Sequence, residues 1–219
     1  MKQLKGQQGF TLVEIAIVLV IVGLLLGGVL KGQSMIENAR VAQAANSVNG
    51  IIAAVNTYLD RYGRLPGDDG NLAALRARGG AWDFAIGFGN QNGIIENVQG
   101  TTFTAAAGEG IAFWQHLRAA GLIRGEVGAT GPAALPHNPF GGSIGFTNGG
   151  VYGMPAGNKI CLGSVPGATA QALDSRLDDG RPDQGIMRAH RGNDNAAPGA
   201  TPVATAFNEN FQHTMCIRF

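Results

Sequence analysis

The sequence predicts an α+β protein in which a long N-terminal α-helix packs on a Gly-rich head with a small antiparallel sheet. A run of 21 residues, 10–30, contains a single ionisable group, Glu14, and no proline. Beyond it the apolar residues continue at helical spacing as far as Gly63. The rest of the chain carries short apolar strings bounded by Gly and Asn, a pattern typical of short strands.

Composition indicates a folded chain that is rich in turns and low in charge. Gly accounts for 35 of 219 residues, and charged residues make up 14%, whereas about 25% is typical. Sixteen basic and fifteen acidic side chains give a formal net charge of +1, and the sequence shows no strongly basic tail. Bulk charge therefore gives no support to nucleic-acid binding, and we predict no nucleic-acid partner.

The apolar run at residues 10–30 predicts one membrane-spanning helix. At 1.5 Å per residue it is about 31 Å long, which matches the hydrocarbon core of a bilayer. A cleaved secretory signal is one alternative, but its apolar core is shorter, and the first Ala-x-Ala, at 42–44, lies well past the run. An ordinary anchor is another alternative, in which Glu14 reaches the interface from the start of the helix.

The hexapeptide Gly-Phe-Thr-Leu-Val-Glu at residues 9–14 follows a short basic leader with Lys2 and Lys5 and opens the apolar helix. This arrangement closely resembles the class III signal of the prepilin family, which comprises type IV pilins and type II secretion pseudopilins. The resemblance implies that a membrane peptidase cuts after Gly9 and methylates the new terminal amine of Phe10.

The residue types of this motif suit that chemistry. Gly9 has no side chain, so a protease can approach its backbone closely. After cleavage, Phe10 carries a positive amine four positions before Glu14, and the acid also favours the positive end of its own helix dipole. The resemblance implies that Glu14 of one subunit pairs with the Phe10 amine of a neighbour, since an unpaired charge in an apolar bundle is costly.

The helix is expected to continue to Tyr62, where Gly63 and Pro66 stop it. An amphipathic stripe predicts its buried face, formed by Val41, Val48, Ile52, Val55, Leu59 and Tyr62. The predicted organisation is a cleaved leader at 1–9, a membrane and assembly helix at 10–30, an amphipathic continuation at 31–63 and a globular head at 64–219.

Within the head, turn residues and apolar spacing predict a set of short elements. We expect a turn at 65–71, helices at 72–78 and 109–123, strands at 143–147, 151–154 and 159–162, a loop at 192–206 and a closing strand at 211–219. His116 is predicted to be a structural histidine that is either at the surface or half-buried.

Four carboxylates cluster around a Gly-Pro turn at residues 174–183. They are Asp174, Asp178, Asp179 and Asp183. The sequence favours a structural turn whose acids are neutralised by Arg176 and Arg181. The alternative is a calcium site, because carboxylate oxygens are the ligands that calcium prefers. No other cofactor is predicted.

The resemblance places Cys161 and Cys216 outside the cytoplasm, where thiols are usually oxidised. We therefore expect a disulfide, which closes a loop of 56 residues. The alternatives are two buried free thiols or a zinc site with His190 and His213, although no CxxC or HxxxH spacing supports zinc.

The chain contains no GxSxG, GxxxxGK or HExxH motif, and we predict that it is not an enzyme. The resemblance implies a filament subunit of a type IV pilus or a type II secretion pseudopilus, and the size of the chain favours a minor member. It also implies a single-pass precursor in the bacterial inner membrane with a periplasmic head. The implied partners are other subunits, the prepilin peptidase and the assembly platform of that membrane. The alternative functions are a membrane-anchored periplasmic binding domain and an anchored hydrolase.

Overall fold

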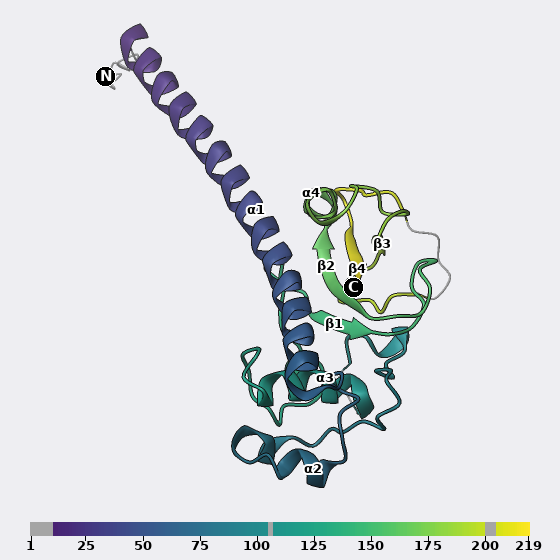
Figure 1. Ribbon diagram of the computed structural model, residues 1–219. Helices are drawn as coiled ribbons and strands as arrows, with labels where there is room; N and C mark the ends of the chain where they lie inside the picture. Colours follow the sequence, from purple (N-terminus) through teal and green to yellow (C-terminus); the bar gives the residue numbers. More distant parts are fainter. Residues whose placement is uncertain (1–10, 105–106, 200–204) are drawn as a thin grey trace, which may run out of the picture. The chain divides into compact units, whose positions relative to one another are not determined.

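The computed structural model describes residues 11–104, 107–199 and 205–219 (Figure 1). Its helices are α1 (Leu12–Tyr62), α2 (Leu72–Arg76), α3 (Gly108–Ala119) and α4 (Gly167–Leu177), with 3-10 turns at Gly80–Phe84, Gln99–Thr101 and Pro132–Ala134. The strands are β1 (Ile144–Thr147), β2 (Lys159–Pro166), β3 (Met187–Arg191) and β4 (Gln212–Arg218). They form an antiparallel sheet in the order β1-β2-β4-β3, which confirms the predicted α+β class.

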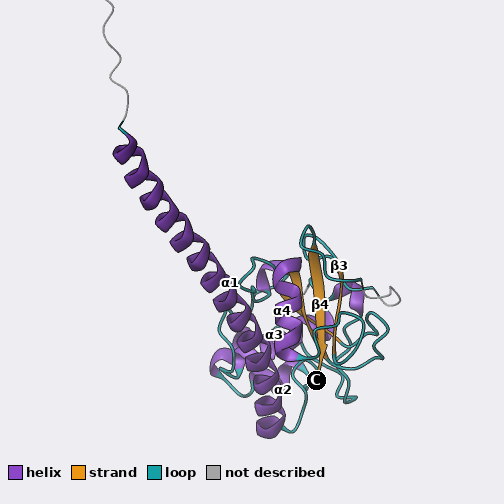
Figure 2. Ribbon diagram, turned by 90° about the horizontal axis from the view of Figure 1, so that it is seen from above, coloured by secondary structure: helices purple, strands orange, loops and turns teal. Residues whose placement is uncertain are grey.

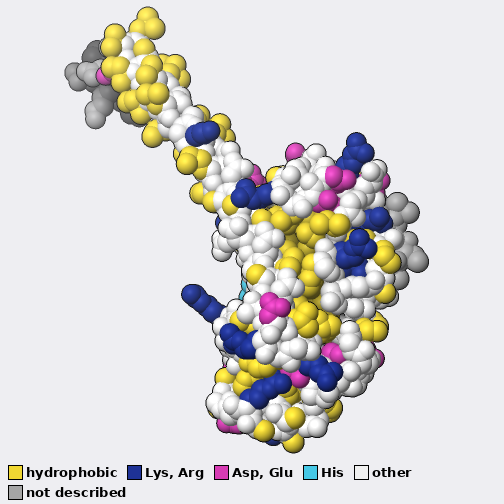
Figure 3. Space-filling model, viewed as in Figure 1, with side chains coloured by type: hydrophobic (Ala, Val, Ile, Leu, Met, Phe, Trp, Pro, Cys, Tyr) yellow, Lys and Arg dark blue, Asp and Glu magenta, His cyan; other side chains and the backbone are white. Residues whose placement is uncertain are grey.

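The chain divides into two compact units, Met1–Ala39 and Arg40–Phe219, and the boundary falls within α1. In the first unit, the Leu, Ile and Val side chains of α1 are exposed and cover the helix surface (Figure 3). This part of α1 is long and apolar enough to cross a membrane, and none of the apolar stretch is buried within the protein.

In the second unit, α1 buries one face along residues 41–58. The buried side chains are Val41, Ala44, Ala45, Val48, Ile51, Ala54, Val55 and Tyr58. The predicted stripe is thus confirmed at three valines, but Leu59 is 41% exposed. At 100° per residue the buried face passes through Tyr58 rather than Leu59, and small alanines complete it. The helix ends at Tyr62 as predicted, and Gly63 adopts the left-handed conformation that such an end favours (φ 66°).

Helix α3 is the centre of the head, because every side chain along residues 109–119 is buried. On one side, the ring of His116 stacks on Tyr58 of α1 with centroids 6.2 Å apart. On another side, Phe113 stacks on Phe146 of β1 at 4.2 Å. The helix therefore packs against both α1 and the sheet. It ends at Ala119, earlier than predicted.

The predicted position of His116 is wrong, since this side chain is fully buried, but the predicted structural role is confirmed by its hydrogen bonds. Its Nδ1 accepts the N–H of Gly67 at 2.9 Å, and its Nε2 lies 3.1 Å from the carbonyl oxygen of Gly87. Because a carbonyl only accepts, Nε2 must carry the proton and the ring is neutral. Burial lowers the pKa of His116 to about 4. The ring therefore joins two loops through its two nitrogens.

One face of the sheet is a continuous apolar surface in the core. Its register places Ile144 beside Leu162 and Phe146 beside Ile160, and the same two rows continue across β4 and β3 through Met215, Ala189, Ile217 and Met187. All eight side chains are buried. Helix α4 packs against β2 and β4, and Figure 2 shows it beside β4.

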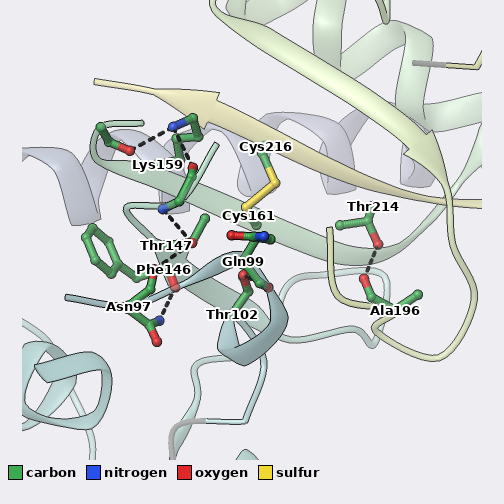
Figure 4. The surroundings of a disulfide bond; sticks show 12 residues. Asn97, Gln99, Thr102, Phe146, Thr147, Lys159, Cys161, Ala196, Thr214 and Cys216 are labelled. Atoms are coloured by element: carbon green, nitrogen blue, oxygen red, sulfur yellow. Dashed lines mark hydrogen bonds between the residues drawn. A yellow bond between two sulfur atoms is a disulfide. The ribbon is translucent and has the colours of Figure 1, made fainter. Parts of the chain in front are cut away.

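The opposite face of the sheet carries the disulfide between Cys161 and Cys216 (Figure 4). These residues are direct partners on β2 and β4, with Cα atoms 4.1 Å apart, and both are buried. The bond leaves neither thiol for zinc. Gly145 lies in the same row, and a Cβ there would collide with the carbonyl oxygen of Thr102, so the absence of a side chain lets that loop lie against the strand.

Three further predictions for the head need correction. The strand predicted at residues 151–154 is only an isolated bridge. Val151 pairs with Met154 across a tight turn, and among the described residues this pair lies outside the named strands. The predicted strand at 159–162 runs on to Pro166 through a bulge after Leu162. Strand β3 lies in a segment for which we predicted no strand, since only Met187 and Ala189 of its five residues are apolar and buried.

Removing the disulfide should lower the free energy of unfolding by about 4 kcal/mol, because a loop of this length then gains freedom in the unfolded chain. Urea unfolding of the full chain in detergent, with and without reductant, measures the loss. A Cys161→Ala/Cys216→Ala double variant should be equally destabilised and should no longer respond to reductant. A response of the double variant, or an unchanged midpoint on reduction of the wild type, would contradict this assignment.

Acid should destabilise the head through His116. The unfolded chain takes up this proton near pH 6.5 and the folded chain only near pH 4, so stability falls as the pH drops through this window. The loss approaches about 3 kcal/mol. Urea unfolding at several pH values between 7.5 and 4 gives the free energy of unfolding at each pH. The slope of this free energy against pH should be shallower for His116→Gln than for the wild type. The exposed His137 provides the control, since His137→Gln should keep the wild-type slope. Equal slopes in all three proteins would reject the role of His116.

Candidate functional site

The first described residues of α1 form a capping box between Thr11 and Glu14. Thr11 directly precedes the helix, and Glu14 is its third residue. The backbone N–H and the hydroxyl of Thr11 each donate to Glu14 Oε2 at 2.8 Å, while the N–H of Glu14 approaches Thr11 Oγ1 at 3.3 Å. The two residues thus satisfy each other's backbone donors, as a Thr-x-x-Glu capping box does.

This box matters because the helix that follows it is apolar. Backbone donors at a helix start have no partner within the helix, and hydrocarbon supplies none. Both Thr11 bonds fall on Oε2, so the other carboxylate oxygen, Oε1, takes no part in the box. Glu14 was predicted from sequence. Thr11 was missed, although its spacing of three residues before a Glu is the signal that finds such boxes.

The predicted processing residues, Gly9 and Phe10, lie outside the described residues. The described residues that follow them in α1 have exposed apolar side chains. Leu12 is 90% exposed and Leu24 is 74% exposed, in a segment whose other large side chains are also exposed. A continuous apolar surface of this kind is typical of a segment that contacts lipid or another protein.

A second candidate site lies at the C-terminal end of α4, where three carboxylates meet. Asp174 is fully buried on the helix, Asp178 is the half-buried residue that caps it, and Asp179 is exposed. One carboxylate oxygen of each lies within 4.8 Å of those of the other two. Asp183, the fourth predicted ligand, is exposed and lies outside this group.

Each acid of the cluster accepts one backbone N–H, two of them from the loop that follows α4 and one from the first residue of β3. Asp174 Oδ1 accepts from Gly180 at 3.2 Å, Asp178 Oδ2 from Met187 at 2.8 Å, and Asp179 Oδ1 from Arg181 at 2.9 Å.

The buried Oδ2 of Asp174 has no hydrogen-bond partner among the described residues. Burial raises the pKa of Asp174 to about 7, and the nearby charges of Asp178 and Asp179 act in the same direction.

The neutralising arginines that we predicted are not paired with these acids. In the part of the chain that the structure describes, the one salt bridge joins Arg78 to Asp69 at 2.8 Å. Arg176 and Arg181 are both exposed. A long side chain in water gains little from an ion pair and loses rotamer freedom by forming it.

Comparison with known protein families places a signal at the N-terminus. Residues 4–30 match the family described as the Prokaryotic N-terminal methylation motif, and this range includes Gly9, Phe10, Thr11 and Glu14. No curated protein matches the chain. The motif is that of a structural protein family rather than an enzyme family. The chain therefore carries the N-terminal methylation signal of type IV pilins and pseudopilins, and this signal supports a pilin-like or pseudopilin precursor.

Proposed function

We propose that the mature protein is a structural subunit of a type IV pilus or type II secretion pseudopilus filament and assembles through its N-terminal helix. The observation that carries this proposal is a methylation motif joined to a helix segment that is apolar and exposed on all sides, with one carboxylate at its third position. A globular protein does not leave such a surface bare in water. Lipid covers it in the precursor, and neighbouring helices cover it in the filament.

Proteolytic processing converts the membrane-held precursor into a subunit that can enter the filament. The prepilin peptidase removes residues 1–9 by cutting after Gly9 and methylates the amine of Phe10. The precursor is held in the inner membrane by residues 10–30, with the head of residues 64–219 in the periplasm and residues 31–63 continuing the helix into it. The assembly platform of that membrane then transfers the subunit to the filament, where its partners are other subunits.

Glu14 has two roles in this scheme, and the capping box makes them compatible. Within one subunit, Oε2 holds the start of the helix through Thr11. Oε1 is left to accept the Phe10 amine of a neighbouring subunit without breaking the box. Pairing two opposite charges inside an apolar bundle offsets the high cost of leaving either one unpaired. The pair also fixes the axial position of each subunit relative to the next.

Processing can be tested on the native protein. Intact-mass measurement should show a chain that has lost residues 1–9 and gained one methyl group, which peptide fragmentation places on the amine of Phe10. The same protein from cells without the prepilin peptidase should keep its leader. A full-length, unmethylated chain in cells that contain the peptidase would reject the processing step.

Three variants separate the charge of Glu14 from its capping role. Glu14→Gln keeps a capping acceptor but removes the charge, so it should enter the membrane normally and be incorporated poorly into filaments, as Glu14→Ala should. Thr11→Val keeps the charge but breaks the cap, which costs about 1 kcal/mol of helix stability, and it should still assemble. Incorporation is measured as the share of the protein in sheared surface fibres.

Thr11→Ser, which preserves the box, is the control and should match the wild type. Assembly of Glu14→Gln at the wild-type level, together with failure of Thr11→Val, would show that the cap matters rather than the charge.

A further inference from the structure

We propose that Asn92 is a self-modification site, at which the side-chain amide is converted to a carboxylate through attack by the backbone nitrogen of Gly93. The site lies in the head, in the loop between the 3-10 turns at Gly80–Phe84 and Gln99–Thr101. It is separate from the assembly helix, so the inference does not depend on the filament function. The hydrogen bonds of this loop give a partner to each atom that the reaction changes, and water is the only co-reactant.

The attacking atom is the nitrogen of Gly93, and a buried carboxylate lies on its proton. This N–H donates to Asp68 Oδ2 at 2.6 Å, and the N–H of Asn92 donates to Oδ1 of the same acid at 3.1 Å. Asp68 is 1% exposed, so the protein rather than solvent sets its position. A carboxylate held in this way can act as a general base. Gly93 has a φ of 84° and no Cβ to shield its nitrogen.

The group under attack is the side-chain amide of Asn92, and both of its polar atoms are held. Its Oδ1 accepts the N–H of Ile94 at 2.8 Å, and its Nδ2 donates to Glu96 Oε1 at 2.9 Å. The first bond polarises the amide and stabilises the negative charge that develops on Oδ1, as an oxyanion donor does. The second bond orients the leaving nitrogen. Asn92 is exposed, so water can reach the product of the attack.

The steps of the reaction follow from these contacts. Asp68 takes the proton of the Gly93 nitrogen, which forms a bond to Cγ of Asn92 while the C=O electron pair moves to Oδ1. When this pair returns, the Cγ–Nδ2 bond breaks. The proton held by Asp68 passes through water to Nδ2, which leaves as ammonia. Water then opens the five-membered imide ring at either of its carbonyl groups, which leaves aspartate or isoaspartate at position 92. Nothing is oxidised or reduced.

The modification would change how this loop is held. In the unmodified chain, Glu96 Oε1 accepts from the side-chain amides of both Asn90, at 3.3 Å, and Asn92, at 2.9 Å. Afterwards one of these donors is replaced by a carboxylate, which repels Glu96. The change is irreversible, so the loop of an old molecule differs from that of a newly made one.

The chain supplies its own comparison, because it contains three Asn-Gly pairs, at 49–50, 92–93 and 148–149. Gly50 lies within α1, and the N–H of Gly149 donates to the hydroxyl of Thr147 at 3.1 Å. Among the described residues, only the Gly93 nitrogen of the three pairs donates to a carboxylate. Folding should therefore slow the reaction at Asn49 and Asn148, because it restrains them without supplying a base, and accelerate it at Asn92.

The test incubates the full-length protein in detergent at physiological pH and temperature, and a second sample in the same buffer after reduction and unfolding in guanidinium chloride. Peptide mass spectrometry follows the deamidation of the three asparagines over time, and chromatography separates aspartate from isoaspartate. We expect Asn92 to react at least about tenfold faster in the folded chain than in the unfolded one, as a general base allows. Asn49 and Asn148 should react more slowly in the folded chain.

Asp68→Asn tests the base, and Asp83→Asn, which removes an exposed acid outside the site, is the matched control. Loss of the base should slow the reaction at Asn92 in the folded chain, whereas a mere loosening of the loop would accelerate it. Asp83→Asn should react as the wild type does. If Asp68→Asn does not fold, the wild-type comparison decides alone. The inference is overturned if Asn92 reacts more slowly in the folded wild type than in the unfolded chain, or if folded Asp68→Asn reacts as fast as the wild type.

Discussion

Glu14 places a negative charge at the start of a helix whose side chains are otherwise without charge as far as residue 30. In an apolar environment such a charge must have partners. Two hydrogen-bond partners come from within the chain, because the carboxylate accepts the N–H and the hydroxyl of Thr11. Neither donor carries a formal charge, so the helix start is capped while the net charge remains. In the proposed filament a neighbouring amine supplies the missing positive charge, and this need makes a lone subunit incomplete.

The Gly-rich loops of the head have little regular structure of their own, so their backbone groups need partners from elsewhere in the head. Polar side chains on the buried helix α3 bind the backbone of these loops. Gln115 accepts the N–H groups of Ile86 and Gly87, and Glu109 accepts those of Asn90 and Glu96. Arg118 donates to three carbonyl groups in the segment 124–134. One helix thus replaces the hydrogen bonds that a larger sheet would provide, and its own polar groups are satisfied in return.

Elements with a strong local pattern were predicted from sequence, and those defined by distant contacts were not. The long helix and its end at Gly63 follow from hydropathy and turn chemistry, and β1 and β4 follow from short apolar strings. Strand β3 was missed because its register on β4, rather than its own composition, makes it a strand. The burial of His116 could not be predicted from its own stretch of sequence. The loops that enclose it contain residues 67 and 87, which are distant from it in the chain. At the sites, the acids were identified, but only folding shows that Asp183 lies apart from the other three.

The claim on which the proposed assembly rests is that Glu14 of one subunit meets the terminal amine of another. Its most direct test is a cryo-electron microscopy structure of the native filament at a resolution that shows side chains. The prediction is that a carboxylate oxygen of Glu14 lies within about 4 Å of the Phe10 nitrogen of an adjacent subunit. A filament in which Glu14 contacts only its own Thr11, with every neighbouring amine beyond that reach, would contradict the claim.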